Sequence, residues 1–159
     1  MLQKDNLTTN DSKTKKYKTA SLIAFGIAVF GIIFLIKNKS VLSQNPITIV
    51  IQVCSMGLMI WARITFGRRS FHAAANTTEG KLITSGPYKW LRHPIYAAVI
   101  YFFWASLISY PEIQTLIAVL MITGGLFARM IFEEKNLLTV YDEYAAYMKR
   151  TKRIIPFIF

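Results

Sequence analysis

Cysteine, histidine and acidic residues are scarce in this sequence. Cys54 is the single cysteine, so an internal disulfide is excluded. His72 and His93 are the only histidines, which is too few for a multi-histidine metal centre, and no metal is expected. Aspartate and glutamate number 8 against 19 lysines and arginines, so the formal net charge is +11. Folds held together by disulfides or by such a metal centre are therefore set aside.

Apolar residues are abundant, at 53% of the 159 residues, which is unusual for a soluble domain of such high charge. The two properties are segregated, because long apolar runs alternate with short basic stretches. A nucleic-acid-binding surface needs a soluble fold to carry its basic stripe, so no nucleic-acid partner is expected. We predict one membrane domain over residues 19–159. The polar segment 1–18 is predicted to be disordered or to lie on the membrane surface.

Four apolar runs are long enough to be membrane spans. Lipid leaves no partner for unpaired backbone groups, and the alternation of a barrel strand is absent, so the runs are predicted to be helices. The short connection 110–112 makes the last two an antiparallel hairpin. The fold class is therefore predicted to be an all-α integral membrane bundle of four transmembrane helices. The predicted spans are residues 20–36, 46–66, 94–109 and 113–132.

The basic residues outside these spans give an orientation. Along the chain the five polar stretches hold five, two, five, zero and five lysines and arginines. This alternation places both termini and the connection 67–93 on the cytoplasmic side, because basic loops stay inside. A soluble cofactor would then be bound by that cytoplasmic loop and by the C-terminal tail.

The loop ends in a group of residues capable of chemistry. Gly86-Pro87 marks a turn, and Pro94 suits the first position of a helix, with His93 as its cap. The unpaired N–H groups of a helix start can bind an anion such as a carboxylate. The alternative is that the arginine and the aromatic residues here only anchor the helix at the membrane surface.

The end of the last span and the tail carry the other candidates. Arg129 and Glu133 are four residues apart and share a helix face, so Arg129 either pairs locally with Glu133 or faces a polar cavity. Glu133 and Glu134 point about 100° apart on a helix and do not form a catalytic pair by themselves. Apolar residues at helical spacing predict an amphipathic helix over residues 137–150, lying on or beside the membrane.

Taken in order, these segments resemble the isoprenylcysteine carboxyl methyltransferase family, and phospholipid methyltransferases share a similar arrangement. The resemblance covers about half of the chain, residues 79–156. It rests on an ordered set of motifs rather than on any one of them. The set is Gly86-Pro87-Tyr88, Arg92-His93-Pro94-x-Tyr96, Glu133-Glu134, Tyr144-x-x-Tyr147, Arg150, Arg153 and Pro156.

The resemblance implies a membrane-embedded methyltransferase that uses S-adenosylmethionine and takes a lipophilic or prenylated substrate from the bilayer. The loop and the C-terminal helix would form the cofactor pocket. Arg129, Glu133 and Glu134 are the candidate catalytic residues; for Arg129 this follows from its position alone, from which it could hold an anionic head group of the substrate. The implied cofactor contacts are Gly86, Pro87, Tyr88, Leu91, His93, Tyr96, Glu133, Glu134, Tyr144, Tyr147, Arg150 and Arg153.

Two positions depart from the family pattern. Ala98 stands where a glycine often follows the motif tyrosine, and Val140-Tyr141 stands where Phe-Gly often precedes the tail tyrosines. Both put the family's substrate in question for this chain. The methyl acceptor stays open between a carboxylate, an amine and a thiol, as do the roles of the two glutamates. Pairing into a homodimer is also open, and the composition is compatible with a prokaryotic plasma membrane.

Two other functions are compatible with the sequence. Membrane sterol reductases resemble the C-terminal half and use NADPH, for which Arg68 and Arg69 could bind the 2′-phosphate. These enzymes are usually longer. A non-enzymatic adaptor that binds anionic lipid through its basic faces would explain the charge and the spans. It would not explain the ordered motifs.

Overall fold

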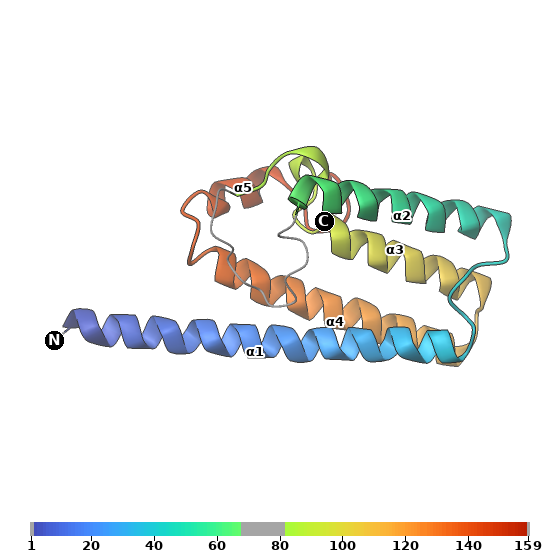
Figure 1. Ribbon diagram of the computed structural model, residues 1–159, viewed down its shortest axis with the longest axis horizontal. Coiled ribbons are helices and arrows are strands. Elements are labelled where there is room, and N and C mark those ends of the chain that lie inside the picture. The colour runs from blue at the N-terminus through green and yellow to red at the C-terminus, as the bar shows by residue number, and fades with distance from the viewer. Residues whose placement is uncertain (1, 68–81, 159) are drawn as a thin grey trace.

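The computed structural model describes residues 2–67 and 82–158, with side chains described from residue 16 onward (Figure 1). The described residues form helices joined by short turns, together with one isolated β-bridge. Arg68, Arg69 and His72 lie outside the described residues, and so does the start of the segment 79–156. The helices are α1 (Leu2–Lys37), α2 (Pro46–Phe66), η2 (Gly86–Lys89), α3 (Pro94–Ser109), α4 (Ile113–Leu137) and α5 (Tyr144–Arg150).

Helices α2 and α3 begin and end where the sequence predicts. Each starts with a proline at the first position, where the missing N–H is harmless. Before α2, the side chain of Asn45 accepts a hydrogen bond from the backbone N–H of Ile47 at 2.9 Å. The helix ends at Gly67, whose φ of 68° is a conformation that glycine adopts without strain.

Three predicted boundaries differ from the structure. α1 is helical from Leu2, which differs from disorder as one expectation for residues 1–18; the other expectation, that the segment lies on the membrane surface, stays a prediction. The segment has no proline or glycine, so a helix nucleated in the apolar run extends through it at little cost. α4 continues to Leu137 rather than ending at Phe132. The predicted helix 137–150 is helical only from Tyr144.

The chain turns between α4 and α5 without a glycine. The side chain of Thr139 donates to the carbonyl of Asn136 at 2.7 Å, and the backbone N–H groups of Val140 and Tyr141 both donate to Leu137. These bonds satisfy carbonyl groups at the end of α4 and stop the helix there. Val140-Tyr141, which departs from the family pattern, therefore still lies in a turn.

The four long helices pack in the spatial order α1, α4, α3, α2 (Figure 1). The closest approach is between α1 and α4. A Cβ atom on Gly125 would lie 2.6 Å from the carbonyl oxygen of Ala24, and one on Gly31 would lie 2.8 Å from that of Ala118. Small residues let membrane helices touch in this way. Gly125 lies at this contact, whereas the adjacent Gly124 has open space around it.

Three helices are long and apolar enough to cross a membrane, judged over the described residues: Lys16–Lys37, Pro46–Phe66 and Ile113–Leu137. Their outward side chains are apolar; Ile23, Val53 and Ile64, for example, are all exposed. α3 has 16 residues and is too short to meet the same length criterion. The fourth span therefore stays a prediction.

The end of the bundle away from α5 is held by a buried amide. Gln52 of α2 accepts from the backbone N–H of Ser43 at 3.0 Å and donates to the carbonyl of Val41 at 2.8 Å and to Ser106 of α3 at 3.0 Å. These bonds fix the connection between α1 and α2 against α3. Buried amides are stable in such surroundings when their donors and acceptors are paired.

Candidate functional site

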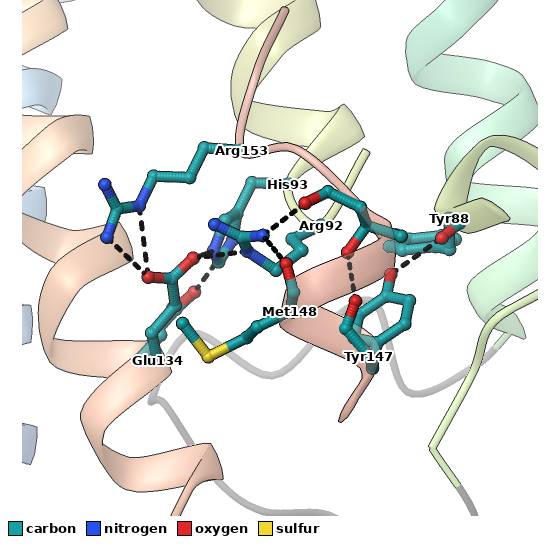
Figure 2. Close-up of polar contacts among 9 residues, drawn as sticks. Tyr88, Arg92, His93, Glu134, Tyr147, Met148 and Arg153 are labelled. Carbon is teal, nitrogen blue, oxygen red and sulfur yellow. Dashed lines mark hydrogen bonds and ion pairs between the residues drawn. The ribbon is translucent and has the colours of Figure 1, made fainter. Parts of the chain in front are cut away.

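The start of α3, the end of α4, α5 and the C-terminal tail meet at one end of the molecule (Figures 1 and 2). The tail pairs with the loop before α3 through a parallel bridge between Leu91 and Lys152. The N–H of Arg92 donates to Lys152 at 2.7 Å, and that of His93 donates to Arg153 at 3.1 Å. Residues about 60 positions apart in the sequence are thereby fixed side by side.

Glu134 is the centre of this cluster, as Figure 2 shows. Its side chain is almost completely buried. Arg92 Nε donates to Oε1 at 2.7 Å, Arg153 donates to Oε2 through Nη2 at 2.9 Å and Nε at 3.1 Å, and His93 Nε2 lies 3.3 Å from Oε1. A buried carboxylate needs such partners, because burial removes its hydration.

Arg92 also holds the end of α5. Its Nη1 donates to the carbonyl oxygens of Met148 at 3.0 Å and Thr151 at 2.6 Å (Figure 2). A cation at the C-terminal end of a helix satisfies carbonyls that have no helical partner. One guanidinium therefore connects α4, α5 and the loop before α3.

Glu133 forms a second cluster beside the first. Arg129 Nε lies 2.9 Å from its Oε1, and Tyr96 donates to the same oxygen at 2.7 Å. Arg129 Nε also donates to the Tyr96 hydroxyl at 2.6 Å. The guanidinium is buried, and its local pairing with Glu133 is one of the two alternatives that the sequence spacing left open.

His93 lies between the two carboxylates. Its Nδ1 is 3.9 Å from Glu133 Oε2, while its Nε2 faces Glu134. Its ring stacks on that of Tyr96 with centroids 5.6 Å apart. The adjacent glutamates thus have different partners and share this histidine.

The tail tyrosines are buried against the loop. Tyr147 donates to the carbonyl of Tyr88 at 2.7 Å, and the rings of Tyr144 and Tyr147 are 5.8 Å apart. Burial raises the pKa of Tyr147 to about 12 and also raises the pKa of Tyr88 and of Tyr144. At physiological pH these hydroxyl groups are neutral, so they serve as hydrogen-bond donors rather than as bases.

Most of the predicted site residues come together at this end of the bundle. Pro87, Tyr88 and Leu91 are buried in the loop. Gly86 has a φ of 55°, and a Cβ there would lie 2.6 Å from Thr65 Oγ1, so glycine allows the loop to approach α2. Arg150 is exposed, and no hydrogen bond or ion pair places it in the cluster within the part of the chain that is described.

The sequence left the role of Arg92 ambiguous, because an arginine at this position could also anchor the helix at the membrane surface. Its place next to His93 was the signal, but its partner Glu134 lies 42 residues away. No motif pointed to Phe25 of α1. The centre of the Arg129 guanidinium lies 4.7 Å from the centroid of the Phe25 ring.

A family model described as phospholipid methyltransferase matches residues 44–144, which is more than half of the chain. The matched part contains α2, α3 and α4, with the Arg92-His93-Pro94 segment and both glutamates. No curated protein and no solved structure matches the chain.

Proposed function

Because this chain belongs to the phospholipid methyltransferase family, we propose that it transfers a methyl group from S-adenosylmethionine to a lipophilic acceptor in the membrane. The observation that carries the proposal is the buried Glu134 cluster, in which Arg92, His93 and Arg153 converge from the loop and the tail. The same segments carry the motif residues of the resemblance. Enclosure of a cofactor pocket by them is part of the proposal.

The residues present fit the chemistry of this cofactor. S-adenosylmethionine carries a sulfonium, an ammonium and a carboxylate, together with an adenine ring. The cluster offers carboxylates for the cations, guanidinium groups for the carboxylate, and the rings of His93 and Tyr96 for stacking. We expect Glu134, Arg92 and Arg153 to exchange part of their mutual pairing for pairing with the ligand.

The reaction asks for alignment more than for acid–base catalysis. When bound, S-adenosylmethionine supplies a methyl carbon that bonds to the acceptor as its bond to sulfur breaks, leaving a neutral thioether. A carboxylate or thiolate acceptor needs no base, so the chain's residues hold the reactants in line. An amine acceptor must lose a proton, and Glu133 is the better candidate to accept it, because the pairing of Glu134 with Arg92 and Arg153 stabilises its charged form. The buried tyrosines are poor candidates, because burial raises their pKa.

We further propose that α3 is a fourth span and that both termini are cytoplasmic. α3 has 16 residues and is about 24 Å long, which is short for a hydrocarbon core of roughly 30 Å. Support comes from its position between α2 and α4, both of which are long enough to span. The distribution of lysine and arginine supports the orientation.

Calorimetric titration of the detergent-purified protein with S-adenosylhomocysteine, beside NADPH, tests the cofactor. We expect saturable binding of S-adenosylhomocysteine that is at least tenfold weaker in His93→Ala and in Glu134→Gln. Glu143→Gln is the matched control, because Glu143 is exposed at the start of α5. Binding of NADPH alone would assign the chain to reductase chemistry. Binding of neither ligand by folded protein would favour the adaptor.

A further inference from the structure

The buried guanidinium of Arg129 has an aromatic neighbour from outside the family match. Phe25 lies on α1, and the match begins at residue 44. The Phe25 ring centroid is 4.7 Å from Arg129 Cζ, within the range of a cation–π interaction. Arg129 is also bonded to Tyr96 and Glu133. α1 therefore contributes directly to the surroundings of Arg129, one of the candidate catalytic residues.

A second residue of α1 lies beside the same stretch of α4. The two helices run antiparallel, with Tyr17 against Phe132 and Ala24 against Gly125. Ser21 lies between these two contacts, so it faces the part of α4 that contains Arg129. Its side chain is fully buried, and its hydroxyl has no hydrogen-bond partner among the described residues. A buried hydroxyl without a partner is uncommon and suggests a site for a polar ligand group.

Phe25 also lies at the surface that the bilayer covers. Its ring is only half-buried, whereas the neighbouring Leu22 and Ile23 are exposed. Glu134, in contrast, is enclosed by Arg92, Arg153 and His93. The cluster of Arg129, Tyr96 and Glu133 thus lies on the side of the site that borders α1 and the lipid. The Glu134 cluster is the side nearer to the tail.

We propose that α1 forms the acceptor side of the site. In this arrangement Phe25 positions the guanidinium of Arg129, which binds the acceptor head group. The Ser21 hydroxyl, which lacks a partner, forms its hydrogen bond with the same head group. Because the Arg129 guanidinium and the Ser21 hydroxyl can both donate hydrogen bonds, they would hold an anionic oxygen of that head group, in a carboxylate or a phosphate. The inference rests on the proposed methyl transfer.

The test measures methyl transfer in lipid nanodiscs to two probes, a farnesylated cysteine derivative and phosphatidylethanolamine. The first offers a carboxylate and the second a phosphate beside its amine, so the two rates distinguish the sources of the oxyanion. Kinetics are compared for native protein, Phe25→Leu, Phe25→Tyr, Ser21→Ala and Phe30→Leu. Phe30 is the matched control, because it is a phenylalanine of the same helix that is 60% exposed.

We expect Phe25→Leu to raise KM for the accepted probe roughly 5- to 30-fold, the range that a lost cation–π interaction predicts. Phe25→Tyr should restore KM to within about twofold, because its ring keeps a negative face. Ser21→Ala should also raise KM, and Phe30→Leu should match native protein. Binding of S-adenosylhomocysteine should be unchanged in all four variants.

Three results would overturn the inference. An equal KM in Phe25→Leu and Phe30→Leu would show that the ring does not position Arg129. Weaker S-adenosylhomocysteine binding in Phe25→Leu would place Phe25 on the cofactor side. Absence of turnover with both probes would exclude the oxyanion acceptor. Failure of native protein to bind S-adenosylhomocysteine is a separate outcome, because it contradicts the proposed function itself.

Discussion

Glu134 carries a negative charge although its side chain is almost completely buried. Three neighbouring side chains stabilise this charge. Arg92 and Arg153 supply two positive charges, and His93 supplies a third polar contact. Removing one member of a buried ion pair leaves the others charged and poorly hydrated. The residue is therefore expected to matter for stability as well as for any ligand.

At the residue scale, we predict that Glu134→Ala lowers the free energy of unfolding by about 3–5 kcal/mol, because Arg92 and Arg153 lose their shared carboxylate. Thermal unfolding in detergent, followed by intrinsic fluorescence, measures the change. Glu143→Ala, at an exposed position, should stay within about 0.5 kcal/mol of native protein. Equal stability of the two variants would mean that the Glu134 cluster does not hold the tail.

The sequence offered the local ion pair of this site as one of two alternatives, but it did not indicate the pairs between distant residues. Arg129 and Glu133 are one helical turn apart, so spacing alone brings them together. Glu134 meets Arg92 and Arg153 only because the tail folds back onto the loop, and spacing carries no information about that. The ordered motifs identified both glutamates without revealing which partners each would have.

Among the elements, prolines gave the best boundaries. Pro46 and Pro94 fixed the starts of α2 and α3, because a proline is accepted in the first turn and rejected further in. The predictions for the polar ends of α1 and α4 were less accurate, because no proline marks where these helices end. Hydrophobicity indicates only which part of a membrane helix lies in lipid, and the helix itself can continue into water.

The contact between α1 and α4 yields a matched pair of glycine variants. Gly125→Ala places a methyl group 2.6 Å from the Ala24 carbonyl oxygen, so the helices must separate. We expect a loss of about 1–3 kcal/mol in unfolding free energy. Gly124→Ala meets open space and should be neutral or stabilising by up to about 1 kcal/mol, since alanine favours helix.

Chemical unfolding in mixed detergent micelles measures both variants. Equal losses would show that close packing of α1 on α4 is not what Gly125 provides, because Gly124 makes no such contact.

At the scale of the whole molecule, four spans require the two sets of connections to lie on opposite sides. In a Cys54→Ser background, Lys89→Cys and Lys149→Cys should be labelled by an impermeant maleimide only from the cytoplasmic side. Lys39→Cys and Glu112→Cys should be labelled only from the other side. All four positions are exposed. Labelling of Lys39→Cys and Glu112→Cys from different sides would remove α3 as a span.

The pairing of the tail with the loop before α3 also orders events during synthesis. Arg153 follows all the described helices along the sequence, and the bridge at Lys152 needs the same later segment. A nascent chain can therefore have all its helices in the membrane while the carboxylate of Glu134 still lacks one of its cations. Closure of the Glu134 cluster therefore comes only after α4 has been translated, because it needs the later residues around Arg153.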